Sequence, residues 1–430
     1  MERYWHSVTL EKDLCKGCTN CLKLCPTQAI RVQGGKAKIL KERCIDCGEC
    51  IRVCPYHAKK AATDNFSILE DYKYKIALTA PTFYGQFSIA EDINVILTAI
   101  TESGFDDVFE VAWGARVISE KTRQLLKEGK LLKPTISSAC PAVLRLIAVR
   151  FPGLVNHIIP LRSPMEVAAA EARKRAVGKT GLKPSEIGVF FISPCAAKET
   201  AVKDLLTVNE SAVSGVFSMK EVFLRIARDV GKISSPKKFE LAGSEGIGWA
   251  ASGGEGIATG VKKYIAVDGI HNVIKILEDM EDGKLSDVDF VEALACAGGC
   301  VGGPLAVENN FVARSRIQRI CKNNPGAEKI NIPEDLNCFW DKPVKPRTIM
   351  NLDDNIERAM EKMTEIERIY QKLPQLDCGS CGSPSCHALA EDIVRGYAQE
   401  NDCIFILKEK IKDLAREMVE LDDSIGKKQK

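Results

Sequence analysis

The stretch CKGCTNCLKLCP, residues 15–26, recurs as CIDCGECIRVCP, residues 44–55. Each copy reads C-x2-C-x2-C-x3-C-P, and the fourth cysteine of such a run ligates the other cluster in two-cluster ferredoxins. Zinc also accepts C-x2-C, but two full copies with the trailing proline favour iron–sulfur clusters. The spacing predicts two 4Fe–4S clusters, one held by Cys15, Cys18, Cys21 and Cys54, the other by Cys44, Cys47, Cys50 and Cys25.

The segment between the two runs, AIRVQGGKAKIL (29–40), alternates apolar and polar residues around Gly34–Gly35. This pattern is typical of a β-hairpin. Residues 1–70 are therefore predicted to form an α+β, ferredoxin-like domain held together by its two clusters.

The composition is that of a soluble globular protein, with 45% hydrophobic and 27% charged residues in a chain of 430. The net charge of +2 gives no reason to expect a nucleic-acid partner. No apolar run approaches membrane-spanning length, and the first residues lack a leader pattern, so we expect a cytoplasmic protein without membrane contact. In that compartment, 18 clustered cysteines indicate metal ligation rather than disulfides.

From about residue 73 the pattern changes to alternating strands and helices. Apolar runs predict strands at YKIALTAP, DVFEVAW, IGVFFIS, YIAV and DVDFVEALA. Apolar residues at helical spacing from Ile89 to Ile100, and the segment 268–281, predict helices between them. This order indicates an α/β domain with largely parallel strands.

Four further cysteines lie in three loops of this domain. Cys140 ends TISSAC, Cys195 follows the third predicted strand, and Cys296 and Cys300 follow the fifth. Binding crevices of open α/β sheets lie beyond the carboxyl ends of the strands, so these thiols are expected to meet in one pocket. The glycines 298, 299, 302 and 303 would let backbone approach a large cofactor closely. Cys321 and Cys338 have no partner pattern and are predicted to be packing residues.

The C-terminal region carries a fourth cysteine set and two heptad-like seams. The ligands expected there follow C-x2-C-x4-C-x16-C: Cys378, Cys381, Cys386 and Cys403. Four thiolates suit a 4Fe–4S cluster or zinc, and the clusters already predicted favour iron; His387 is expected on a helix surface. Apolar residues spaced by three and four run from Leu352 to Leu373 and from Ile404 to Ile425, as if they were the arms of one helical hairpin.

The three cysteine loops resemble the signature segments of iron-only (FeFe) hydrogenases, which usually read T-S-C-C-P, M-P-C-x-x-K-x-x-E and M-A-C-x-x-G-C-x-x-G-G-G. The resemblance includes GFDDVFEVAWGA (104–115), LRSPM (161–165) and the N-terminal module, and covers roughly residues 1–320. CGSCGSPSC resembles the 4Fe–4S domain appended to sensory members of the family.

This resemblance implies a ligand set for the H-cluster, which joins a cubane to a two-iron subcluster carrying carbonyl, cyanide and dithiolate ligands. The cubane would be held by Cys140, Cys195, Cys296 and Cys300. Cys300 would also bridge to the two-iron subcluster, and Lys198 would match the lysine that hydrogen-bonds a cyanide.

The departures from the family pattern concern proton transfer. Ala139 stands where catalytic members have the cysteine that passes protons to the cluster, and Ser193 where they have methionine. In the following helix region Glu120 persists, but Lys121 and Gln124 replace carboxylates of the proton route. Since alanine cannot relay a proton, the resemblance implies low turnover, with Ser193 or water as another route.

Three functions remain open from the sequence. The first is a dihydrogen or redox sensor that passes electrons through its 4Fe–4S clusters to a redox protein such as ferredoxin, and reports to a signalling partner or forms a homodimer through the heptad-like helices. The second is a slow hydrogenase. The third is an iron–sulfur assembly or electron-transfer protein without the two-iron subcluster. The predicted domains are 1–70 (ferredoxin-like), 71–350 (hydrogenase-like), 351–373 (heptad-like helix), 374–405 (helical 4Fe–4S domain) and 406–430 (charged heptad-like helix).

Overall fold

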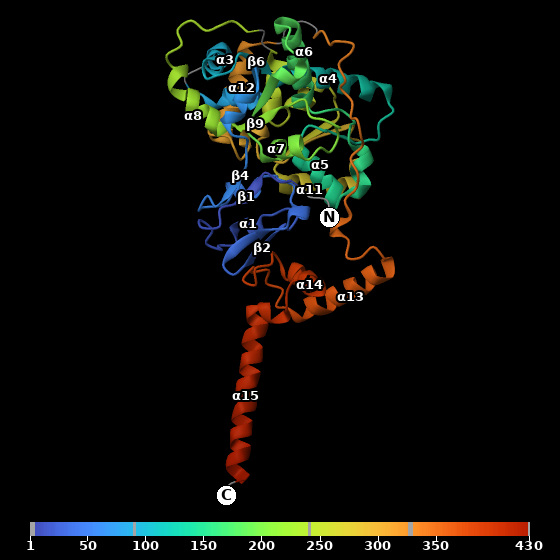
Figure 1. The fold of residues 1–430 in the computed structure, drawn as a ribbon. Coiled ribbons are helices and arrows are strands. Elements are labelled where there is room, and N and C mark those ends of the chain that lie inside the picture. Colours follow the sequence, from blue (N-terminus) through green and yellow to red (C-terminus); the bar gives the residue numbers. More distant parts are fainter. Residues whose placement is uncertain (1–4, 89–91, 240–241, 326–329, 429–430) are drawn as a thin grey trace. The chain divides into compact units, whose positions relative to one another are not determined.

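The fold is described from a computed structural model that covers residues 5–88, 92–239, 242–325 and 330–428 (Figure 1). By their internal contacts the residues form two units. The larger unit comprises Met1–Thr9, Ile45–Arg52 and Lys60–Arg347, and the smaller comprises Leu10–Cys44, Val53–Lys59 and Thr348–Lys430. The five-part division expected from the sequence stays a prediction.

The larger unit is built on two parallel sheets. One has the strand order β6-β5-β8-β9, formed by β5 (Tyr74–Thr79), β6 (Asp107–Glu110), β8 (Ile187–Ser193) and β9 (Gly215–Ser218). In the other, β11 (Phe290–Leu294) lies between β10 (Tyr264–Asp268) and the two-residue β7 (Thr135–Ile136). The parallel α/β architecture predicted from the sequence is confirmed, and β9 and β7 are strands that the sequence pattern did not reveal.

Helices connect the strands and cover the sheets. They are α3 (Ile93–Glu102), α4 (Val111–Glu128), α5 (Pro141–Arg150), α6 (Pro164–Thr180), α7 (Ala196–Lys203), α8 (Met219–Val230), α9 (Ser244–Ile247), α10 (Gly254–Thr259), α11 (Ile270–Glu281) and α12 (Asn310–Asn323). Ile89, which was expected to begin the first of these helices, lies outside the described residues. No helix within the described ranges combines the length and the apolar character needed to cross a bilayer.

One strand is shorter than predicted. DVFEVAW was expected to be extended throughout, but β6 ends at Glu110 and α4 begins at Val111. Val111, Ala115 and Ser119 are buried and recur every four residues, so the apolar run continues as the buried face of a helix.

The middle of the second cysteine run, Ile45–Arg52, belongs to the larger unit. Ile45 is 2% exposed and belongs to the same apolar core as Val143 and Ile147 of α5. The segment continues into the short helix α2 (Glu49–Arg52). His6 Nδ1 lies 2.7 Å from Asp46 Oδ2, and the Val8 amide donates to Asp46 Oδ1 at 3.0 Å.

The smaller unit contains the predicted hairpin, β2 (Ile30–Gln33) paired antiparallel with β3 (Lys36–Ile39), and the short helix α1 (Asn20–Lys23). Strands β1 (Val8–Leu10) and β4 (Lys59–Ala61) pair with each other, and each contains residues of both units. The C-terminal helices are α13 (Ile356–Lys372), α14 (Cys386–Val394) and α15 (Ile404–Lys428).

Within the smaller unit, α14 is tied to β2 by buried charge pairs. Arg31 donates from Nε and Nη2 to the two carboxylate oxygens of Asp392, at 2.5 and 2.9 Å. Arg43 donates to Glu391 at 2.5 Å, and the Val32 amide donates to the Gly382 carbonyl at 2.9 Å. A bidentate arginine–carboxylate pair fixes orientation as well as distance, so this packing is specific.

The expected hairpin of paired C-terminal arms is wrong. α13 packs through Ile366 and Ile369 against Leu389 of α14. The seam of α15 remains exposed at Ile411, Leu414, Met418 and Leu421, which are 58–70% exposed. A heptad pattern specifies an apolar stripe but not its partner.

Candidate functional site

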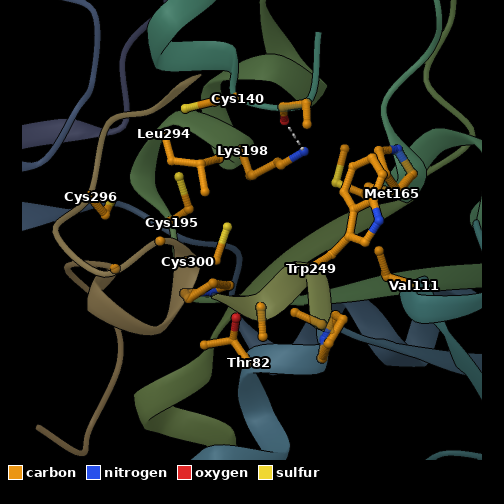
Figure 2. A pocket seen from close by; sticks show the side chains of 18 of the residues that line it. Thr82, Val111, Cys140, Met165, Cys195, Lys198, Trp249, Leu294, Cys296 and Cys300 are labelled. Carbon is orange, nitrogen blue, oxygen red and sulfur yellow. Dashed lines mark hydrogen bonds between the residues drawn. The ribbon is translucent and has the colours of Figure 1, made fainter. Parts of the chain in front are cut away.

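Three loops of the larger unit enclose a cavity of about 90 Å³. The cysteines on these loops each follow a parallel strand: Cys140 comes after β7, Cys195 after β8, and Cys296 and Cys300 after β11. All four line the cavity, as the carboxyl-end rule leads one to expect. Figure 2 shows these cysteines around one side, with Met165, Trp249 and Val111 opposite.

The four thiols influence one another electrostatically. Burial raises the pKa of Cys195, and thiolates at Cys296, Cys140 and Cys300 would raise it further. Burial, followed by Cys296 and Cys140, raises the pKa of Cys300 to about 12. Four neighbouring thiolates therefore need a compensating cation, and a metal centre supplies one because it deprotonates the thiols that coordinate it. The donor set fits the iron–sulfur cluster expected here.

Two glycines of the third loop are required by the packing of the loop against the rest of the protein. Gly299 has φ +92°, and a Cβ there would lie 2.5 Å from the amide nitrogen of Ser252. A Cβ on Gly303 would lie 2.3 Å from the carbonyl oxygen of Pro194. Both glycines also line the cavity. The loop that contains Cys296 and Cys300 therefore depends on glycine at these positions to pack closely on its neighbours.

Lys198 and Ala139 lie on the same side of the cavity. The Lys198 ammonium donates to the Ala139 carbonyl at 3.0 Å, the dashed bond in Figure 2. Both residues line the cavity. The side chain of Ala139 ends at a methyl group, which neither donates nor accepts a proton.

The other positions linked to proton transfer lie elsewhere. The Ser193 hydroxyl donates to the Cys195 carbonyl and accepts from the Cys195 amide, at 2.9 and 3.0 Å. Glu120 pairs with Arg123, and Gln124 is exposed. Ser193, Glu120, Lys121 and Gln124 are not among the described residues that line the cavity. Ser193 therefore supports the ligand loop.

Two buried carboxylates that sequence reasoning missed line the same cavity. Glu255 is 2% exposed and accepts from the Ser137 hydroxyl at 2.6 Å. Glu292, inside β11, accepts from the amides of Gly253 and Gly256 at 2.9 and 2.8 Å. Burial raises the pKa of both, and the Glu292 charge raises that of Glu255 further. The pair can hold a proton beside the cavity at neutral pH.

The sequence contained a signal for one member of this pair. Glu292 is the single charged residue within the apolar strand FVEAL, and a charge inside a buried strand needs a partner or a proton. Glu255 lies in the glycine-rich stretch 243–260. The structure forms α9, a 3-10 turn and α10 there, and places Trp249, Ala250 and Glu255 against the cavity.

The first ferredoxin-type ligand set comes together within the smaller unit. Its members line one small cavity: Cys15, Cys18, Cys21 and Cys54. Although burial opposes it, amide hydrogen bonds from Ala37 and Gly17 and the Lys59 ammonium lower the pKa of Cys15. Lys59 also lines the cavity, and its buried ammonium has no hydrogen-bond partner in the described structure. An unpaired buried cation beside four thiols fits an anionic iron–sulfur cluster.

The second set is divided between the units, with Cys47 and Cys50 in the larger and Cys25 and Cys44 in the smaller, and stays a prediction. The C-terminal set lies within the smaller unit, where Cys386 and Cys403 are buried in one core and Cys381 packs against it. Burial raises the pKa of Cys381, and thiolates at Cys378 and Cys403 would raise it further.

The remaining cysteines and the C-terminal histidine lie where the sequence predicted. Cys338 is buried in an apolar core, and Cys321 packs against another. His387 is exposed on α14 and its ring packs edge-on against Tyr370, with centroids 5.7 Å apart.

Family models match three parts of the chain. The model described as iron only hydrogenase large subunit, C-terminal domain, matches residues 73–254 and 225–304, which together span more than half of the chain. A 4Fe-4S dicluster domain matches 7–55, and an Fe-S cluster model matches 373–405. The last match indicates iron in the C-terminal site, where the sequence left zinc open.

Curated proteins from several organisms are similar to the chain. Iron hydrogenase 1 of Clostridium pasteurianum is 22% identical over 358 residues, 70% of this chain and 58% of that protein. The periplasmic Fe hydrogenase large subunit of Nitratidesulfovibrio vulgaris is 26% identical, covering 69% and 86%. The chain thus spans less than two thirds of the Clostridium protein.

A shorter similarity joins the chain to the cytosolic Fe-S cluster assembly factor nar1 of Aspergillus flavus, 27% identical over 37% of this chain and 28% of that protein. Among solved structures, FeFe-hydrogenase HydA1 of Chlamydomonas reinhardtii is 17% identical, with a TM-score of 0.43 over 59% of this chain and 87% of that one.

Proposed function

The chain belongs to the iron-only hydrogenase family, and we propose that it binds dihydrogen, turns it over slowly and acts as a dihydrogen or redox sensor. The observation that carries this proposal is the cavity itself. Four thiols and Lys198 line it together with the methyl group of Ala139, at the position where the family resemblance implies a proton-relaying cysteine. Loss of a positioned acid–base group typically costs 10²–10⁴ in rate.

The residues present fit the H-cluster. Cys140, Cys195, Cys296 and Cys300 would hold its cubane, and Cys300 would also bridge to the two-iron subcluster. When bound, that subcluster supplies the site at which dihydrogen is converted to protons and electrons. Lys198, held by the Ala139 carbonyl, would orient it through a hydrogen bond. The apolar wall formed by Val111, Met165 and Trp249 limits the access of water.

Protons would be held at the Oε atoms of Glu255 and Glu292, because both carboxylates are buried and adjacent to the cavity. Ser137 connects this pair to the Ala139 loop, since its hydroxyl donates to Glu255 and accepts from the Ala139 amide at 3.2 Å. This arrangement offers a residual proton route that bypasses the missing thiol. Slow turnover, rather than none, is the consequence.

Electrons would pass through the 4Fe–4S clusters to a redox protein such as a ferredoxin. Signalling would be transmitted by α15, either to another protein or within a homodimer. Its exposed seam has isoleucine or methionine at one heptad position and leucine at the other (Ile404, Leu407, Ile411, Leu414, Met418 and Leu421). Isoleucine and leucine in this alternation favour two-stranded coiled coils. A cytoplasmic location remains a prediction.

The similarity to nar1 supports a second candidate, an iron–sulfur assembly or electron-transfer protein that keeps the cubane but never receives the two-iron subcluster. Infrared spectroscopy of anaerobically matured protein separates the two candidates. Carbonyl and cyanide bands are expected under the first, and their absence despite a filled cubane would establish the second.

The iron content tests the cluster assignment. Protein reconstituted without the two-iron subcluster is expected to contain about 16 iron atoms per chain, four for each of four cubanes. Anaerobic iron and zinc analysis measures this. A content of about 8 iron atoms per chain would mean that neither the C-terminal site nor the H-site holds a cubane.

Glu255→Gln is expected to lower dihydrogen evolution roughly tenfold at equal infrared band intensity. The amide keeps a hydrogen bond to Ser137 but cannot carry the proton; Glu292 can still hold it, so the loss stays below the usual range for an acid–base group. Glu110→Gln is the matched control, because Glu110 is buried and accepts from Tyr84 at 2.7 Å but is not among the described cavity-lining residues. Equal rates for wild type and Glu255→Gln would exclude this route.

A further inference from the structure

Arg52 links the second ferredoxin-type cysteine run to the cavity of the H-site. It ends α2, two residues after Cys50. Its Nη1 donates to the Cys296 sulfur at 3.5 Å and to the Gly302 carbonyl at 3.3 Å, and its Nη2 donates to Glu49 at 2.6 Å. All of these residues belong to the larger unit.

The backbone fixes the place of this guanidinium. Gly48 has φ +74°, and a Cβ there would lie 2.5 Å from the Pro304 ring, so α2 packs directly on the segment after Cys300. Cys47 packs against the same apolar core as Cys140 and Cys195. The Arg52 side chain is 24% exposed, which leaves its charge only partly screened by water.

The Arg52 guanidinium places a positive charge within hydrogen-bond distance of the Cys296 sulfur. A cation beside a cluster stabilises the extra electron of its reduced state, and hydrogen bonds to the cysteine sulfurs act in the same direction. The Glu49 carboxylate offsets part of this effect.

We propose that Arg52 raises the reduction potential of the cubane held by Cys296, through its charge and its hydrogen bond to the Cys296 sulfur. The inference rests on the proposed function, because it requires a cubane at the H-site.

The test uses the full chain, reconstituted with 4Fe–4S clusters but without the two-iron subcluster, in redox titrations followed by EPR. The H-site signal is identified as the one lost in Cys140→Ser. Arg52→Gln is expected to make its one-electron reduction at least tenfold less favourable, a shift of about 59 mV to lower potential. Glu49→Gln is expected to shift it upward, and Arg52→Lys to retain most of the wild-type potential because the charge remains. The C-terminal cluster serves as the internal reference.

The possible outcomes distinguish a failure of the Arg52 inference from a failure of the proposed function. An H-site signal that keeps its potential in both Arg52→Gln and Glu49→Gln overturns the role of Arg52 and leaves the proposed function intact. The absence of any signal sensitive to Cys140→Ser overturns the proposed function and this inference with it. Opposite shifts in the two variants establish the inference, since a merely structural defect would not change sign with the charge.

Discussion

Ala139→Cys is expected to increase dihydrogen evolution roughly 10²-fold, the lower end of what a positioned acid–base group contributes. Residue 139 lines the cavity and immediately precedes Cys140, so a thiol there lies beside the proposed cluster. Its carbonyl is already held by Lys198 and its amide by Ser137, which keeps the backbone in place when the side chain changes. The rate is measured with a strong reductant at equal infrared band intensity.

The gain should remain partial because α4 offers no carboxylate along its cavity-facing residues. Val111 and Ala115 line the cavity, and Ser119, one turn further on, accepts from the Trp249 indole at 3.1 Å. Ala139→Ser is the matched control: a hydroxyl of similar size is too weak an acid to replace a thiol. A cysteine variant no faster than wild type would place the bottleneck elsewhere, and a wild type as fast as catalytic hydrogenases would refute the sensor proposal.

The cysteines could be placed from the sequence because two rules act together. A buried apolar run such as IGVFFIS predicts a strand, and parallel strands end at a common edge. Cys140 and Cys300 follow β7 and β11 of one sheet, which brings them together, whereas Cys195 follows β8 of the other sheet and reaches the same cavity through the packing of the two sheets. The same rules could not locate Arg52, since its bond to Cys296 joins residues 244 apart through the packing of α2.

Periodicity was least informative where an element changes type within one apolar run. DVFEVAW suits a strand and a helix equally over seven residues, and packing decides in favour of α4 from Val111. Periodicity also gave no sign of the short helices in the glycine-rich stretch that contains Glu255, for another reason. Tertiary packing stabilises short helices there against the weak helix propensity of glycine.

Arg31→Met is expected to destabilise the packing of α14 by about 3–5 kcal/mol, the usual cost of removing one partner from a buried ion pair. The side chains of Arg31 and Asp392 are 6% and 7% exposed, and their bidentate bond joins β2 to α14. The variant leaves Asp392 buried with the Ser383 hydroxyl, at 2.8 Å, as its one remaining side-chain donor among the residues that the structure describes. Since each 1.4 kcal/mol is about tenfold, the local opening of α14 should become at least 10²-fold more populated.

Hydrogen exchange of the α14 amides measures this opening directly and does not require two-state unfolding of a chain with several clusters. Adding Asp392→Asn to Arg31→Met should recover part of the protection, because it removes the unpaired charge while keeping a partner for Ser383. Arg368→Met is the surface control: Arg368 pairs with Glu365 on the exposed face of α13 and should change nothing measurable. If Arg31→Met leaves exchange of the α14 amides at the wild-type rate, the buried pair does not hold α14 to β2.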